Sequence, residues 1–111
     1  MKKIAFYRLV KSGNGTTFEQ DTGYWVHISH CSGFILDLAI ARNKYGRWDI
    51  THTATGLLCS VRCGYYTRQE AFDSITEELV TAIISKLGNT DVIRLVDRLS
   101  EYAYSQQAIR A

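Results

Sequence analysis

The chain has 111 residues, of which 46% are hydrophobic and 22% are charged. This composition excludes a disordered chain, and this length excludes two independent cores, so we expect a single domain over residues 1–111. Thirteen basic and eleven acidic residues give a formal net charge of +2. That balance excludes a strong overall attraction to nucleic acid or to an anionic membrane, although a local basic patch is compatible with it.

The cysteine content and the N-terminus predict a reduced, cytoplasmic protein. Three cysteines are an odd number, which does not suit a secreted disulfide framework. The apolar stretch after Lys2 and Lys3 stops at Arg8, too early for the core of a signal peptide. No apolar run approaches the roughly 20 residues that cross a bilayer, so we expect no membrane partner.

Short segments with alternating apolar side chains predict a series of antiparallel strands. In 34–42, for example, Phe34, Leu36, Leu38 and Ile40 fall on one face. Glycine, asparagine and polar residues between these segments predict turns, and residues 11–22 read as a loop. The expected strands are 3–10, 24–29, 34–42, 47–53 and 57–63.

The second half of the chain predicts two helices. Thr67 and Glu70 form a capping box, and apolar residues at helical spacing continue to Gly88. Tyr65 and Tyr66 are expected to pack the corner before this helix. A second helix is expected over 90–109, beginning near Thr90 and Asp91.

These elements together predict an α+β fold, an antiparallel four- to five-stranded β-meander followed by two helices packed on one face of the sheet. The other face would then be free for a partner or for a second copy of the chain.

The most suggestive metal-ligating residues are His27, His30 and Cys31, with Cys59 and Cys63 further along the chain. On a strand, Cys59 and Cys63 would lie roughly 13 Å apart at about 3.3 Å per residue, too far to hold one ion. Their alternation with Leu57 and Val61 favours burial in the core. We therefore predict no metal site and no cofactor.

The histidines also suggest acid–base chemistry. His27, His30 and His52, with Asp37 and Asp49, could in principle supply a general acid and base. The sequence has no nucleophile elbow and no His-Glu-x-x-His helix. His52 shares a strand face with Trp48 and Ile50, which is typical of a buried histidine. We predict no catalytic residues, with an enzyme acting through these histidines as an alternative.

A nucleic-acid-binding surface is a further hypothesis. Arg42, Lys44 and Arg47 cluster at a predicted hairpin, and Tyr24 and Trp25 could offer stacking faces. A solvated hairpin explains the same residues, and the small net charge favours that interpretation.

Residues 48–71 carry a resemblance. Trp48-Asp-Ile-Thr-His52, Thr55-Gly-Leu-Leu58 and Tyr66-Thr-Arg-Gln-Glu-Ala71 resemble a pattern of small phage and mobile-element proteins, including anti-CRISPR and other anti-defence proteins. The same pattern resembles the antitoxin half of some toxin–antitoxin pairs with a partial RNase-H-like fold. Those antitoxins place a strand after the first helix, whereas residues 90–109 read as a helix here.

The resemblance implies a non-enzymatic protein that inhibits a bacterial defence system by occupying a surface of a CRISPR effector or another nuclease complex. A nucleic-acid-binding regulator or an antitoxin-like protein is the alternative. Aromatic and arginine side chains dominate binding energy at protein interfaces. Tyr102 and Tyr104 cannot share a helix face, so Tyr104 is expected to be exposed. The expected partner-binding residues are Tyr24, Trp25, Tyr45, Arg47 and Tyr104.

Overall fold

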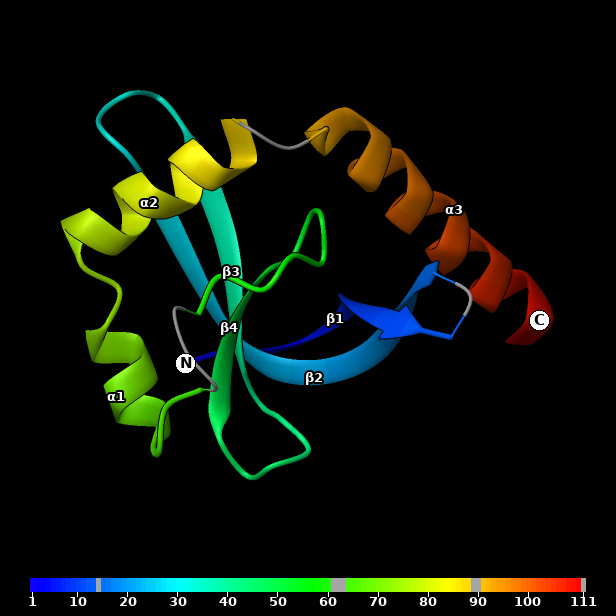
Figure 1. The fold of residues 1–111 in the computed structure, drawn as a ribbon, viewed down its shortest axis with the longest axis horizontal. Coiled ribbons are helices and arrows are strands. Elements are labelled where there is room, and N and C mark those ends of the chain that lie inside the picture. Colours follow the sequence, from blue (N-terminus) through cyan, green and yellow to red (C-terminus); the bar gives the residue numbers. More distant parts are fainter. Residues whose placement is uncertain (14, 61–63, 89–90, 111) are drawn as a thin grey trace.

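The computed structural model describes residues 1–13, 15–60, 64–88 and 91–110 of the chain. This described part forms one antiparallel sheet, in the order β1-β2-β3-β4, followed by three helices (Figure 1). The predicted α+β fold, an antiparallel meander followed by helices packed against it, is confirmed. The elements are β1 (Lys3–Ser12), β2 (Gly15–Ser29), β3 (Ile35–Arg42), β4 (Trp48–His52), α1 (Arg68–Asp73), α2 (Glu77–Gly88) and α3 (Val92–Arg110).

The main core lies between α1, α2 and one face of the sheet. The alternation predicted for β3 is correct for Leu36, Leu38 and Ile40, which are fully buried. Phe34 precedes β3 and is exposed. The helices cover these strand residues with Ala71, Val80, Ile83 and Leu87. Burying a leucine or isoleucine side chain contributes roughly 1.5–3 kcal/mol, so this layer is a main source of stability.

The loop predicted over residues 11–22 is wrong, because most of it belongs to β1 and β2. The two strands pair without interruption from Lys3 opposite Tyr24 to Ser12 opposite Gly15. Most of the first part of β2 is exposed, with Phe18 as a buried exception. Polar residues can occupy a strand that has water on one side, so composition alone suggested a loop here.

The helix predicted from Thr67 to Gly88 is divided into α1 and α2. The Ser74 hydroxyl donates to the Ala71 carbonyl, at 2.6 Å, at the end of α1. Thr76 then starts α2, where its hydroxyl accepts from the Leu79 amide. Side chains that bond nearby backbone groups compete with the helical ladder, which explains the break. Phe72, the first of the apolar residues whose helical spacing predicted one continuous helix with a buried stripe, is exposed at the end of α1.

The predicted fifth strand does not form as a regular strand in the described residues. The chain turns back after β4, and the Cys59 amide donates to the Ile50 carbonyl at 2.7 Å. The Ile50 amide donates to the Ser60 hydroxyl, a side chain, so the ladder is interrupted there. Single bridges pair Thr51 with Leu58 and Trp48 with Tyr65. Residues 61–63, including Cys63, lie outside the described part of the chain.

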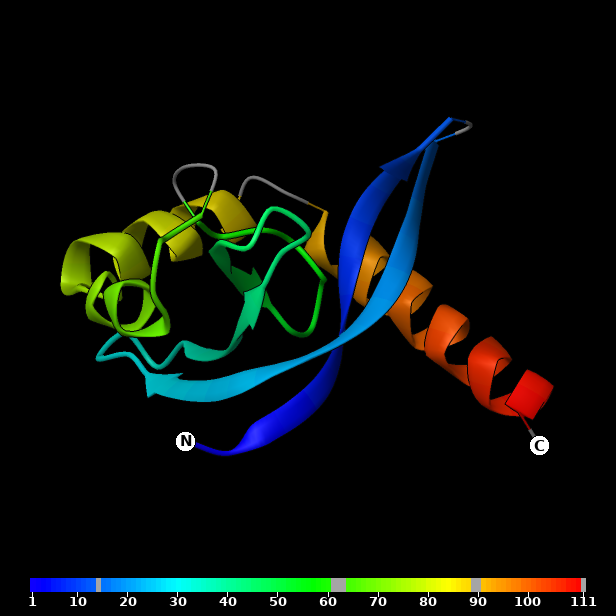
Figure 2. The ribbon, with the colours of Figure 1, turned by 90° about the horizontal axis from the view of Figure 1, so that it is seen from below.

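The sheet face opposite α1 and α2 is only partly open. Phe6 lies across Gly23, and its ring packs in a small cluster with Ala39 and Ala41. Beyond it, the Leu9 amide at the free edge of β1 donates to the Gly56 carbonyl at 2.9 Å. The β1–β2 hairpin bends away from the other two strands, as Figure 2 shows. The expectation of an uncovered face therefore holds only for its remaining part.

The third helix packs along the far end of the β1–β2 hairpin. The Tyr102 ring lies 5.6 Å from the rings of both Tyr7 and Phe18. Tyr104 is 75% exposed, as the two-residue spacing predicts. At the start of α3 the Asp91 carboxylate accepts from the Arg94 amide, whereas Thr90 lies outside the described residues. Among the described helices, none has the length and apolar character to span a membrane.

Candidate functional site

Cationic side chains and aromatic rings meet at the end of the sheet where the β3–β4 hairpin and the start of α1 lie. We call this region the basic–aromatic surface. Its aromatic members differ in exposure, because Tyr45 and Tyr66 are largely exposed whereas Tyr24 and Trp48 are half-buried. It comprises Lys3, Tyr24, Arg42, Lys44, Tyr45, Arg47, Trp48, Tyr66 and Arg68.

Tyr24 is the centre of this surface. The guanidinium carbon of Arg68 lies 4.3 Å from the centre of the Tyr24 ring, and the Lys3 ammonium lies 5.4 Å from it. The Trp48 ring is 6.3 Å away, and Arg42 lies 6.0 Å from Trp48. Each cation over a ring contributes roughly 0.5–1 kcal/mol at an exposed site, so the rings hold these charges at defined positions.

Two further pairs extend the surface. Arg47 lies 4.4 Å from the centre of the Tyr66 ring and donates to the Tyr66 hydroxyl at 3.2 Å. Lys44 lies 5.2 Å from the ring of its neighbour Tyr45. Five of the chain's thirteen basic residues therefore belong to one surface. The cationic side chains are thus gathered in one region although the net charge is small, with Glu70 as an acidic neighbour at the start of α1.

Local hydrogen bonds fix the two segments that carry these pairs. In the β3–β4 hairpin, the Asn43 side-chain oxygen accepts from the amides of Tyr45 and Arg47, at 2.9 and 3.0 Å. Gly46 adopts φ +79°, a conformation that glycine tolerates best. These bonds set the direction in which the hairpin presents its side chains.

The start of α1 is fixed by the predicted capping residues, with one change of partner. The Thr67 hydroxyl accepts from the Glu70 amide at 3.0 Å, as a capping box requires. The Glu70 carboxylate accepts from the amide of Tyr66, one residue before the expected Thr67. The cap thereby holds Tyr66 and Arg68 at either side of the helix start. Of the predicted corner pair, Tyr65 packs against the core, whereas Tyr66 is 71% exposed.

Two hollows adjoin the surface, and Arg42 lines both. The larger encloses about 540 Å³ and reaches from the hairpin to the charged side chains of β1 and β2. In that region Arg8 and Asp21 form an ion pair. The smaller encloses about 260 Å³ and is lined by Lys3, Asp21, Thr22, Gly23, Tyr24, Arg42 and Trp48.

The surface contains some of the residues predicted from the sequence and omits others. All three predicted nucleic-acid-binding residues, Arg42, Lys44 and Arg47, lie in it, as do Tyr24 and Tyr45. Four further members of the surface had no predicted role in binding. They are Lys3, Trp48, Tyr66 and Arg68.

Trp25 lies on the opposite sheet face, because neighbouring residues of a strand point to opposite sides. Its indole donates to Asp37 at 2.9 Å, and His27 Nδ1 donates to the same carboxylate oxygen at 2.7 Å. The bond from His27 is the main cause that lowers the pKa of Asp37 below its usual 3.8, while burial opposes the shift. Tyr104 lies on α3. The five predicted partner-binding residues therefore belong to different parts of the molecule.

The three histidines do not meet in one site. His52 is buried and bonds the Thr55 hydroxyl through Nδ1 at 2.8 Å, which agrees with its predicted place in the core. Burial lowers the pKa of His52 below its usual 6.5, and the charge of Asp37 partly opposes this. Cys59 is also buried, and burial raises the pKa of its thiol to about 11.

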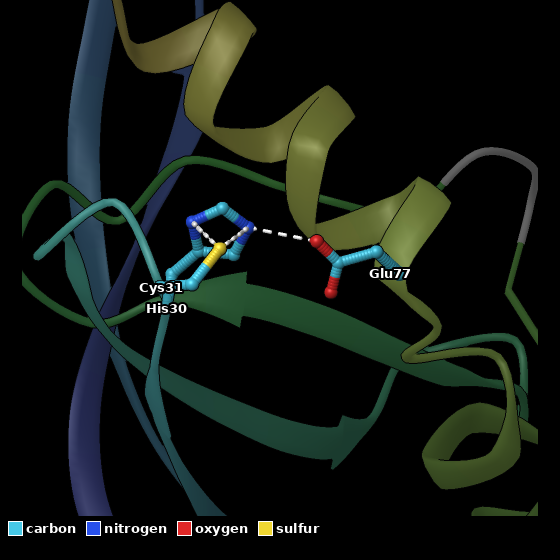
Figure 3. A group of neighbouring side chains, drawn as sticks. All are labelled: His30, Cys31 and Glu77. Carbon is cyan, nitrogen blue, oxygen red and sulfur yellow. Dashed lines mark hydrogen bonds and ion pairs between the residues drawn. The ribbon is translucent and has the colours of Figure 1, made fainter.

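His30 and Cys31 come together with Glu77, a residue that the sequence analysis did not consider (Figure 3). His30 Nε2 lies 2.9 Å from the Glu77 carboxylate. The Cys31 sulfur lies 3.9 and 4.0 Å from the two ring nitrogens of His30. Of the predicted metal-ligating residues, His27 bonds Asp37 on a sheet face and Cys59 lies in the core.

Comparison of the chain with protein families, curated proteins and solved structures finds no match.

Proposed function

We propose that this chain is a non-enzymatic binding protein that holds a single-stranded nucleic acid on its basic–aromatic surface. One observation carries the proposal: five cationic side chains lie against aromatic rings near the β3–β4 hairpin and the start of α1, beginning with Arg68 and Lys3 at Tyr24. Single strands are bound by basic groups that follow the phosphates and by aromatic or guanidinium planes that stack on bases.

The arrangement of the surface favours binding of a single-stranded nucleic acid over binding of a duplex. Tyr45 and Tyr66 are 76% and 71% exposed, so their rings are accessible to unpaired bases. The guanidinium groups of Arg47 and Arg68 already lie close to rings, which keeps them ordered before binding. Ordering side chains in advance reduces the entropy lost on binding. In a duplex, by contrast, the faces of the bases are stacked on one another and closed to these rings.

The hollows beside Arg42 support the same function. They adjoin the β3–β4 hairpin, and the residues that line the smaller hollow include Lys3, Arg42 and Trp48. A phosphate or a base could enter such a concave site with a cation at its edge. Of the acidic residues that line the larger hollow, which are Glu19, Asp21 and Asp49, Asp21 pairs with Arg8 and Asp49 accepts from the Asn43 amide group.

Fluorescence anisotropy of a labelled oligonucleotide of about 15 nucleotides tests this function. We expect binding to the single strand that weakens steeply as salt rises, and weaker binding to the matching duplex. Absence of binding at low salt, or tighter binding to the duplex, would contradict the proposal.

A protein inhibitor of a bacterial defence nuclease is the second candidate, and Trp25 favours it. Trp25 is 37% exposed on the sheet face that α1 and α2 leave free, and Asp37 holds its indole in place. Ordered tryptophans are common anchors of protein interfaces. This candidate predicts that the protein slows DNA cleavage by a purified CRISPR effector complex and that Trp25→Ala removes the effect. Inhibition that instead depends on Arg68 would assign the effect to the basic–aromatic surface.

A further inference from the structure

A histidine, a cysteine and a glutamate meet where the turn between β2 and β3 touches the start of α2. His30 and Cys31 follow directly after the last residue of β2, and Glu77 is the first residue of α2. Their ligand atoms, one from each residue, all lie within 4.8 Å of one another. Figure 3 shows the Cys31 sulfur against the imidazole of His30, with the Glu77 carboxylate beside one of the two ring nitrogens.

The donor set and its spacing fit a zinc ion. Zinc in proteins is bound by cysteine sulfur, histidine nitrogen and carboxylate oxygen, with four ligands in a tetrahedron. At bond lengths of about 2.0–2.3 Å, neighbouring ligand atoms of a tetrahedral site lie about 3.3–3.6 Å apart. Here His30 Nε2 lies 2.9 Å from Glu77 Oε1 and 4.0 Å from Cys31 Sγ. To bind the same ion, the Cys31 sulfur must move away from Nδ1, 3.9 Å from it, toward Nε2 and the Glu77 oxygen, which lies within 4.8 Å.

The turn prepares His30 for this role. Its Nδ1 atom lies 2.8 Å from the Ser32 hydroxyl and accepts from the Ser32 amide at 3.2 Å. When Nε2 binds a metal, Nδ1 carries the ring hydrogen and can donate it in a hydrogen bond to that hydroxyl, which then replaces the bond from the amide. Histidine ligands in metal sites are regularly oriented by such a second bond. The turn itself is closed by the Gly33 amide, which donates to the His30 carbonyl at 2.9 Å.

The exposure of the three residues leaves room for a water molecule as the fourth ligand. The His30 side chain is only 14% exposed, whereas that of Glu77 is 76% exposed and Cys31 lies at the surface. The imidazole is thus held against the protein, while the other two ligands face solvent. A site with three protein ligands and one open position is a common zinc arrangement.

A cysteine nucleophile activated by histidine fits the geometry less well. Such a pair needs the sulfur on the axis of one ring nitrogen, within hydrogen-bond reach. The Cys31 sulfur is almost equally distant from both nitrogens of His30, at 3.9 and 4.0 Å, so it lies on neither axis.

We propose that His30, Cys31 and Glu77 bind one zinc ion, with water as the fourth ligand. The ion joins the β2–β3 turn to the first turn of α2, two segments 47 residues apart in the sequence. Because the folded chain brings the ligands together, zinc binding stabilises the folded state, and above the dissociation constant this stabilisation grows with the logarithm of the metal concentration. This inference is independent of the proposed nucleic-acid function.

Titration of the full chain with Co²⁺, a spectroscopic probe for zinc sites, tests the inference. We expect one equivalent to produce the absorption of a cobalt–thiolate bond and Zn²⁺ to abolish it by displacement. Cys31→Ser should remove that absorption. Glu77→Gln should weaken Zn²⁺ binding by at least about tenfold, since even loss of a residue that only orients a ligand has an effect of that size.

Glu78→Gln is the matched control, because Glu78 is an exposed carboxylate in the same helical turn. It should retain the cobalt absorption and the increase in Tm caused by Zn²⁺, whereas Cys31→Ser should lose both. Circular dichroism establishes that each variant is folded. Absence of a cobalt–thiolate absorption in the parent chain, or its persistence in Cys31→Ser, would overturn the inference.

Discussion

Arg68 lies over Tyr24, with its guanidinium carbon 4.3 Å from the centre of the ring. This contact joins the first residue of α1 to the middle of β2, 44 residues earlier in the chain. It places a helix start, which carries a partial positive charge, beside a ring already accompanied by Lys3. The basic–aromatic surface therefore depends on how the short helix α1 is held.

Thr67 is the residue that caps α1, and its replacement should destabilise the helix that holds part of the basic–aromatic surface. Thr67→Ala removes the hydroxyl that accepts from the Glu70 amide at 3.0 Å. We expect the free energy of unfolding to fall by about 1 kcal/mol, as for other N-cap threonines. Thr81→Ala, at an exposed position inside α2, is the control and should cause no loss, because alanine favours a helix interior. Urea unfolding followed by circular dichroism measures both, and equal effects would contradict the capping role.

Gly23 permits the close approach of Phe6 to β3. A Cβ atom at this position would lie 2.8 Å from the Ile40 carbonyl oxygen and 3.1 Å from the Phe6 ring. We expect Gly23→Ala to lower the free energy of unfolding by about 1–3 kcal/mol, the usual cost of overpacking. Gly13→Ala is the control, since nothing lies within 4 Å of its Cβ position. A Gly23→Ala protein as stable as the control would show that β1 does not pack in this way.

His52 should lower the free energy of unfolding in mild acid. Burial lowers its pKa below 6.5, so below that pH the unfolded chain binds a proton that the folded chain resists. Stability is then present above pH 6.5 and is lost as the pH falls toward the lowered folded-state pKa. Urea unfolding at several pH values between 7.5 and 5 measures this dependence. His52→Gln should show a shallower decrease over the same range, and an equal decrease would exclude His52 as its source.

The two described cysteines should differ strongly in reactivity. Cys31 is exposed, whereas Cys59 is buried with a thiol pKa raised to about 11. The thiolate is the reactive form, so iodoacetamide at neutral pH should modify Cys31 first. Peptide mass spectrometry over a time course identifies the order. Rapid modification of Cys59 in the folded protein would contradict its place in the core.

The strands that bury a full face were predictable, as was the second part of β2, whereas the largely exposed first part of β2 was predicted as a loop. Leu36, Leu38 and Ile40 alternate because one side of β3 faces the helices. The first part of β2 has no such pattern, since Phe18 is the buried residue among largely exposed neighbours. Its strand conformation comes from pairing with β1, which is a tertiary interaction. The break at Ser74 was visible in principle, because Ser74 and Thr76 flank it and Glu77 and Glu78 suit a new helix start.

The candidate sites were only partly predictable for the same reason. Arg42, Lys44 and Arg47 are close in sequence, so a local pattern predicted their cluster. Arg68 reaches Tyr24, and Glu77 reaches His30, only through the packing of α1 and α2 on the sheet. No local spacing indicates either contact.

The salt dependence of single-strand binding tests most directly whether the basic–aromatic surface binds a single-stranded nucleic acid. For single strands, the logarithm of the binding constant falls with the logarithm of salt by about 0.7 for each phosphate neutralised. We predict that Arg42→Gln with Arg68→Gln weakens binding and reduces this slope by roughly 1.4. Arg94→Gln, which removes one such charge from an exposed position on α3, should leave affinity and slope unchanged, so its slope should not fall by the roughly 0.7 expected for one lost phosphate contact. Equal affinities and slopes for the parent chain and the double variant would contradict the account.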